Sequence, residues 1–195
     1  MCRGSAKPIE GRMSKLCIVT ATTNLQQADH CIKSWGDVPV FVVMNGGAGE
    51  GIIERERSTD VWNGADFASW SIPEAPRPLY LGTVPAFRRG VDYALGQGYD
   101  IICALHDDLE LLDPAWAEQV IRHFERTPAC GLAGFGGAIG LGAADIYQIP
   151  YDPMQLARIG FRSNMVDAEV HGMRSLLTER VACLDGFSQI GRREF

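Results

Sequence analysis

Short apolar runs recur along the chain and alternate with segments whose apolar residues are spaced as in a helix. The runs cover residues 15–20, 38–43, 101–105 and 130–135, and each of them predicts a buried strand. The run 101–105 is apolar at every position, so that strand has no polar face. Because such a strand is covered on both sides, the pattern favours a mostly parallel sheet between layers of helices.

Helical spacing predicts helices over residues 25–35, 84–97 and 114–126. Asp113 and Pro114 mark the start of the last of these, because an acidic cap and a proline at the first position are typical of helix N-termini. A glycine follows each of the other two helices and is typical of a helix end. The predicted inward faces carry these residues: Leu25, Ala28, Cys31, Ile32 and Trp35; Phe87, Val91, Ala94 and Leu95; Trp116, Val120 and Phe124.

Strands and helices therefore alternate, an order that is typical of an open α/β sheet. Residues 46–78 are rich in glycine, proline and charge, and we expect loops there with at most one short helix. Residues 1–14 are polar and predict a disordered leader. Residues 15–195 are then expected to form one domain.

The composition excludes several classes of protein. Of the 195 residues, 46% are hydrophobic and 22% are charged, which is enough apolar material for a core and excludes disorder as the main state. With 18 basic and 24 acidic side chains the net charge is −6, so no nucleic-acid partner is expected. No apolar stretch approaches the roughly 20 residues that span a bilayer, so no transmembrane segment is expected.

The chain has six cysteines, and no two of them are spaced as C-x-x-C. This spacing argues against a zinc finger and against a thioredoxin-type motif. We expect all six to be reduced, structural thiols. Because the polar leader also lacks the apolar segment of a signal peptide, we expect a cytoplasmic protein.

The strongest candidate for chemistry is the sequence His106-Asp107-Asp108, which follows the buried run 101–105 directly. Carboxylates at the carboxyl end of a strand lie where α/β folds bind ligands. Two adjacent aspartates repel each other unless a cation neutralises them, and Mg²⁺ or Mn²⁺ suits carboxylates together with substrate phosphate oxygens. The alternative is an exposed acidic turn in which Asp108 or Asp113 caps a helix.

Residues 131–142 contain six glycines and invite a nucleotide-loop interpretation. Neither G-x-G-x-x-G nor G-x-x-x-x-G-K-[ST] occurs, so dinucleotide-binding and P-loop chemistry lose their main support. We expect these glycines to allow a tight turn or a close backbone approach.

A second polar group lies at Asp167, Glu169 and His171. In an extended segment these alternating side chains point to one side, where they could supply a metal ligand or an acid–base group. The alternative is a solvated polar loop. A serine hydrolase is disfavoured, because no G-x-S-x-G motif occurs.

Taken together, these residues resemble family 2 glycosyltransferases of the GT-A fold, a Rossmann-like domain that binds nucleotide-diphospho-sugars. The resemblance runs from about residue 15 to the end and lies in the order and spacing of motifs. His106-Asp107-Asp108 stands where the family has its D-x-D metal motif. Residues 16–22 resemble the family's opening strand, and residues 42–46 resemble its second strand and the Asp-Asn-Gly turn that follows it there. Residues 82–90 are similar to the family's segment with Ala-Arg-Asn-x-Gly. Residues 184–187 with Arg192-Arg193 are similar to its Asp-Gly-Phe…Arg-Arg strand on the acceptor side.

The sequence departs from the family pattern at four places. Met44 replaces the acid that usually contacts the nucleoside, and Arg88 stands where an asparagine is common and could reach a diphosphate. His106 replaces the first acid of D-x-D, which makes Asp108 the strongest candidate for the metal ligand. The chain stops at Phe195, before the family's Glu-Asp segment with the catalytic base, and is therefore expected to be a truncated member.

The resemblance implies a metal-assisted, inverting transfer of a sugar from a nucleotide-diphosphate donor to an acceptor hydroxyl. The acceptor would be a carbohydrate, a lipid-linked acceptor or a protein. The ion would be Mn²⁺ or Mg²⁺, held by His106 and Asp108. The implied nucleotide-binding residues are Thr20, Ala21, Thr22, Asn45, Arg88 and Asp107, and the candidates for the general base are Asp185, Asp167, Glu169 and His171.

Two other functions stay open. A nucleotidyltransferase of similar architecture usually has a basic, glycine-rich loop after its first strand, and residues 21–24 do not form one. A non-catalytic or degenerate nucleotide-sugar-binding module would lack the catalytic base. Metal-dependent hydrolysis of a nucleotide sugar would separate the transferase from such a module.

Overall fold

The computed structural model of the chain describes residues 14–45, 51–55, 83–139, 160–163, 173–175, 178–184 and 186–194. The predicted leader, apart from Ser14, lies outside these residues, as does most of the predicted loop region 46–78. In the part of the chain that is described, no helix is long and apolar enough to cross a membrane.

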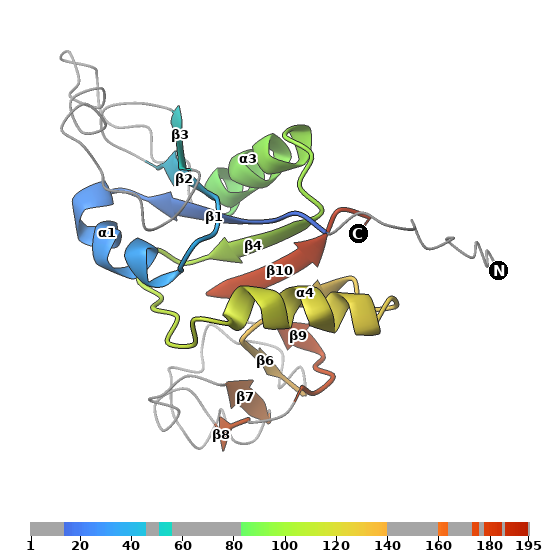
Figure 1. The fold of residues 1–195 in the computed structure, drawn as a ribbon. Helices are drawn as coiled ribbons and strands as arrows, with labels where there is room; N and C mark the ends of the chain where they lie inside the picture. Colours follow the sequence, from blue (N-terminus) through green and yellow to red (C-terminus); the bar gives the residue numbers. More distant parts are fainter. Residues whose placement is uncertain are drawn as a thin grey trace, which may run out of the picture.

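The main element is an open sheet of six strands in the order β3-β2-β1-β4-β10-β5 (Figure 1). β1 pairs in parallel with both β2 and β4, whereas β3 pairs antiparallel with β2, and β10 pairs antiparallel with β4 and β5. The sheet is therefore mixed, with a parallel centre, rather than mostly parallel. Its strands are β1 (Leu16–Thr22), β2 (Val40–Met44), β3 (Gly51–Arg55), β4 (Ile101–Leu105), β5 (Leu132–Ala133) and β10 (Ser188–Arg192).

Helices cover both faces of this sheet, which confirms the predicted α/β class. The helices α1 (Leu25–Ser34) and α4 (Trp116–Arg126) pack on one face, and α3 (Thr83–Gly96) packs on the other (Figure 1). Successive residues of β1 accordingly enter different cores. Ile18 packs in the core under α1 and α4, whereas Val19 packs in the core under α3.

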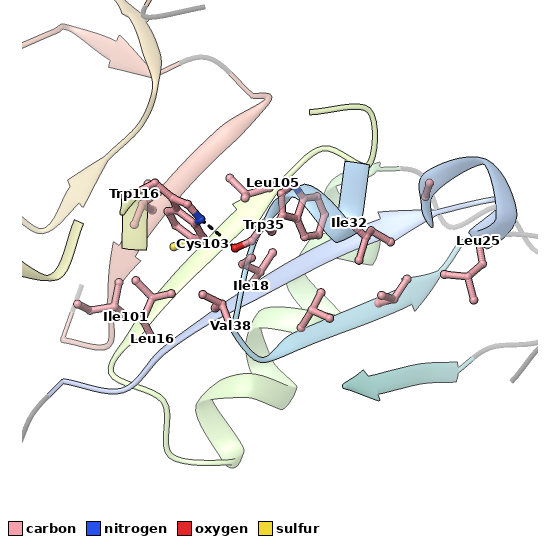
Figure 2. Close-up of a cluster of buried hydrophobic side chains, with 14 of the residues drawn as sticks. Leu16, Ile18, Leu25, Ile32, Trp35, Val38, Ile101, Cys103, Leu105 and Trp116 are labelled. Atoms are coloured by element: carbon pink, nitrogen blue, oxygen red, sulfur yellow. Dashed lines mark hydrogen bonds between the residues drawn. The ribbon is translucent and has the colours of Figure 1, made fainter. Parts of the chain in front are cut away.

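The core under α1 and α4 is the larger of the two and includes the buried side chains of Trp35 and Trp116 (Figure 2). The predicted inward residues Leu25, Ala28 and Ile32 are buried in it. On the other side of the sheet, Ala86, Ala94 and Gly90 bring α3 close to β1 and β2. Glycines with positive φ follow α1 at Gly36 and α3 at Gly98, as predicted from the sequence.

A second, small sheet has the strand order β8-β7-β6-β9. Its strands are β6 (Gly136–Ala138), β7 (Phe161–Ser163), β8 (Met173–Arg174) and β9 (Cys183–Leu184). The predicted strand over 130–135 is shortened to the two residues of β5, and the chain then leaves the main sheet to form β6 of the small sheet. A Cβ at Gly134 would lie 2.5 Å from the carbonyl oxygen of Ser188, so the chain changes sheets where only glycine fits.

Other boundaries also differ from the predictions. α4 begins at Trp116 rather than at residue 114, because Asp113 stabilises a separate turn: its carboxylate accepts the N–H of Ala115 at 2.8 Å. β2 begins at Val40, after the proline, since Pro39 has no N–H to give to the ladder. β3 lies within the predicted loop region and was not predicted as a strand. Its sequence, Gly-Ile-Ile-Glu-Arg, lacks the regular alternation of apolar and polar residues that is typical of a strand.

Candidate functional site

The carboxyl ends of the parallel strands β1, β2 and β4 lie at one edge of the sheet. Thr22 of β1 pairs with Met44 of β2, and the N–H of Asn45 donates to the carbonyl of Thr22 at 2.7 Å. β10 begins at the same edge, where the N–H of His106 donates to the carbonyl of Phe187 at 3.0 Å. This edge therefore brings residues from opposite ends of the sequence together.

Thr20 is placed inside the sheet rather than on its surface. Its side chain is fully buried, and its hydroxyl donates to the carbonyl of Leu105 on the neighbouring strand at 2.7 Å. The hydroxyl thus links β1 to the end of β4, and its hydrogen-bond donor already has a partner within the protein. Ala21, the next residue, packs against the core under α3.

Thr22 and Asn45 are also buried, with 2% and 5% of their surfaces exposed. The hydroxyl of Thr22 accepts the N–H of Asn24 at 3.1 Å and so shapes the turn into α1. Three of the predicted nucleotide-binding residues, Thr20, Thr22 and Asn45, are therefore buried at this edge of the sheet.

The acidic residues lie on a tight turn directly after β4. The N–H of Leu109 donates to the carbonyl of His106 at 3.3 Å, so Asp107 and Asp108 occupy the middle of the turn. Asp108 exposes 86% of its side chain, and His106 exposes 38%. The Nδ1 atom of His106 and the Oδ1 atom of Asp108 are 3.9 Å apart, which is too far for a direct hydrogen bond.

An aromatic ring covers one face of His106. The ring of Phe87 from α3 stacks on the imidazole, with centroids 6.0 Å apart and planes inclined by 17°. From its spacing, Phe87 was predicted only to lie on the inward face of its helix. Its proximity to His106 could not be read from the sequence, because it depends on how far α3 extends along the sheet.

Arg88, the next residue, projects into solvent. It exposes 83% of its side chain, and its Nε atom lies 3.8 Å from Asp92 one helical turn away. The structure therefore does not place Arg88 in contact with His106, Asp107 or Asp108. As an exposed, long side chain it is able to move toward a bound anion.

The turn creates a negative electrostatic field that reaches α1. Burial raises the pKa of the Cys31 thiol, and the carboxylates of Glu110, Asp108 and Asp107 raise it further. Cys31 lies in the second half of α1, so these carboxylates are close to the end of that helix. Such a field favours the binding of a cation at the turn.

The donor atoms of the turn suit a hard or borderline divalent ion. Carboxylate oxygens are ligands that Mg²⁺ prefers, and imidazole nitrogen is accepted by Mn²⁺. Within the described residues, however, no group of three or more His, Cys, Asp or Glu side chains is arranged to hold a metal. His106 and Asp108 would therefore need water or ligand oxygens to complete the coordination of an ion.

The structure gives Arg192 a role away from this edge. Arg192 pairs with Ile101, at the opposite end of β4 from His106. Its guanidinium donates to the carbonyl of Phe124 at 2.6 Å and lies over the ring of the same residue, 5.4 Å from its centroid. Arg192 thus stabilises the last turn of α4.

The four candidates for the general base, Asp185, Asp167, Glu169 and His171, lie outside the described residues. Comparison with known protein families, with curated proteins and with solved structures finds no match for this chain.

Proposed function

We propose that the chain is a metal-assisted glycosyltransferase of the GT-A type that binds a nucleotide-diphospho-sugar at the carboxyl edge of the main sheet. One observation carries the proposal: the His106-Asp107-Asp108 turn follows β4 directly, at the edge of the sheet where the parallel strands β1 and β2 also end. This is the edge at which open α/β sheets bind their ligands.

The neighbouring strand also supports the proposal. The segment that resembles the family's acceptor-side strand includes Phe187, whose carbonyl accepts the N–H of His106. Two of the segments that contribute to the resemblance are thus adjacent in space, although they are separated by about 80 residues in the sequence. An enzyme that joins a donor to an acceptor needs its two half-sites to be adjacent.

Each residue has a proposed role. Asp108, with His106, would hold Mn²⁺ or Mg²⁺, which when bound neutralises the negative charge that develops on the departing diphosphate. Asp107 would contact the ribose, and Arg88 would move onto the diphosphate from the surface of α3. The buried residues Thr22 and Asn45 would present the backbone of the edge to the nucleoside.

Binding of UDP and GDP, measured by titration calorimetry with and without Mn²⁺, tests the donor site. We expect metal-dependent binding of one nucleotide to the wild type and at least tenfold weaker binding to Asp108→Asn, since the amide cannot replace a charged ligand. Glu125→Gln is the matched control, because it removes one negative charge from the exposed surface of α4. Absence of UDP and GDP binding to the folded wild type would refute the proposal.

Turnover distinguishes an enzyme from a module that only binds the donor. We expect slow, Mn²⁺-dependent hydrolysis of UDP-glucose or GDP-mannose by the wild type and its loss in Asp108→Asn. Binding of the nucleotide without hydrolysis of either sugar donor would instead favour the non-catalytic module.

A further inference from the structure

The segment that follows the acidic turn is fixed to the end of α1 by two hydrogen bonds. The indole N–H of Trp35 donates to the carbonyl of Leu109 at 2.7 Å. The N–H of Leu111 donates to the hydroxyl of Ser34 at 3.0 Å. Two consecutive residues, the last residue of α1 and the one that follows it, thus hold two alternate residues of the loop directly after Asp108.

Ser34 and Trp35 are themselves held in place. The hydroxyl of Ser34 donates to the carbonyl of Cys31 at 2.6 Å, so its oxygen is oriented to accept the N–H of Leu111. Trp35 is fully buried, and its carbonyl accepts the indole N–H of Trp116 at 2.9 Å (Figure 2). The end of α1 is therefore a rigid support that is fixed in turn to the start of α4.

A third contact between α1 and this loop is of a different kind. The Nε2 atom of His30 lies 3.0 Å from Oε1 of Glu110, but the two side chains are 82% and 46% exposed. Exposed ion pairs contribute little because water screens them. The support for the loop therefore comes mainly from Ser34 and Trp35.

Among the described residues, the acidic turn has few other restraints, one of which is the stacking of Phe87 on His106. On its first side, the N–H of His106 is bonded to Phe187, and within the turn a bond of 3.3 Å joins Leu109 to His106. Asp108 itself is mostly exposed, so packing does not fix its side chain. The position of Asp108 is set by the two ends of the turn, at Phe187 and at Trp35.

We propose that Ser34 and Trp35 are positioning residues that hold the Asp107-Asp108 turn in the geometry that binds a metal ion and a nucleotide diphosphate. The inference rests on the proposed function, since it names what fixes the same site. The side chains of Ser34 and Trp35 act through the loop and not on the ligand. A loop that is free to move must be ordered each time a ligand binds, and the entropic cost of this ordering would weaken the binding.

Hydrogen exchange of the free protein tests the support without any ligand. In Ser34→Ala the N–H of Leu111 loses its acceptor, so we expect its exchange to become about tenfold faster. Ser34→Thr keeps a hydroxyl and should restore the wild-type rate. Asp100→Ala is the matched control: Asp100 accepts the N–H of Lys15 at 2.9 Å at the opposite edge of the sheet, so this variant should leave the exchange of Leu111 unchanged.

Titration of UDP in the presence of Mn²⁺ then tests the consequence for binding. We expect about tenfold weaker binding to Ser34→Ala and to Trp35→Phe, with wild-type affinity in Ser34→Thr and in Asp100→Ala. Asp100→Ala separates a general loss of stability from a loss of positioning, because it also removes a side-chain acceptor of a main-chain N–H.

Unchanged exchange at Leu111 in Ser34→Ala would overturn the inference. So would wild-type UDP affinity in both Ser34→Ala and Trp35→Phe. If the wild type binds neither UDP nor GDP, the proposed function fails, and the exchange experiment still decides whether α1 holds the turn.

Discussion

Gly90 of α3 lies directly against Val19 of β1. A Cβ atom at Gly90 would be 2.4 Å from Cγ1 of Val19 and 2.8 Å from Cγ2 of Val43. The absence of a side chain therefore lets α3 approach β1 and β2. Because Phe87 is one helical turn earlier in α3, this approach also determines where the ring that stacks on His106 is placed.

Gly90→Ala should destabilise the protein by about 1–3 kcal/mol, because the added methyl group overlaps two buried valines. The free energy of unfolding in urea measures the effect. Gly96→Ala is the control within the same helix: a Cβ there meets no atom within 4 Å. That variant should be neutral or stabilising by up to about 1 kcal/mol, since alanine has the higher helix propensity. Equal effects of the two substitutions would contradict the close approach.

Arg192→Ala should lower the free energy of unfolding by roughly 1–3 kcal/mol. The substitution removes the guanidinium that is bonded to the carbonyl of Phe124 at the end of α4. Nucleotide affinity should not change, because Arg192 lies opposite Ile101 and away from the acidic turn. Arg193→Ala, at an exposed neighbouring position, should change stability by less than about 0.5 kcal/mol. A loss of UDP affinity in a stable Arg192→Ala variant would instead place this arginine at the site.

Thr20→Val tests whether Thr20 contacts a ligand or joins two strands. The substitution keeps the side-chain shape but removes the hydroxyl that donates to the carbonyl of Leu105. We expect a loss of about 1–2 kcal/mol in stability and a change in UDP affinity of no more than about twofold. The exposed Thr23→Val serves as a control for the introduction of valine. A tenfold loss of affinity without a loss of stability would restore the direct contact predicted from the resemblance.

Two buried thiols predict a loss of stability at alkaline pH. Burial raises the pKa of Cys17 and Cys103 well above the ordinary value of about 9. The unfolded chain ionises these thiols above that pH, whereas the folded protein keeps them neutral. Their contribution to stability is therefore complete below pH 9 and decreases as the pH rises further, by about 1.4 kcal/mol for each pH unit and each thiol.

Urea unfolding between pH 8 and pH 10.5 under reducing conditions measures this slope. Above pH 9, Cys17→Ala should show a slope that is smaller by about 1.4 kcal/mol per pH unit than that of the wild type, and below it the two slopes should agree. The comparison between the two proteins cancels the contribution of lysines and tyrosines, which both contain. Identical slopes would show that the thiol of Cys17 ionises in the folded protein.

Much of the fold could be predicted because its signals are local. The strand 101–105 was predicted with the same bounds as β4, and the ends of α1 and α3 were marked by glycines that do have positive φ. The change of sheet between β5 and β6 could not be predicted, because it depends on the close approach of Gly134 to Ser188, far along the chain. The direction of β10 depends likewise on a distant pairing that periodicity does not reveal.

The candidate site could be predicted only in part. The end of β4 marked the acidic residues, since parallel strands present their carboxyl ends at one edge. The sequence did not indicate that the hydroxyl of Thr20 faces inward or that Arg88 projects into solvent. It also did not identify Ser34 and Trp35. A buried tryptophan usually finds a partner for its indole N–H, and that tendency is the signal that could have drawn attention to Trp35.

The insertion of β10 between β4 and β5 affects how the chain folds during synthesis. β10 is translated after every other strand of the main sheet, and β5 has no other neighbour among the described strands of that sheet. Until β10 arrives, the nascent protein carries an unpaired edge along the hydrophobic strand β4, the kind of edge that recruits other chains. The sheet is therefore completed by a non-local pairing, a kind of contact that slows folding and prolongs the exposure of such an edge.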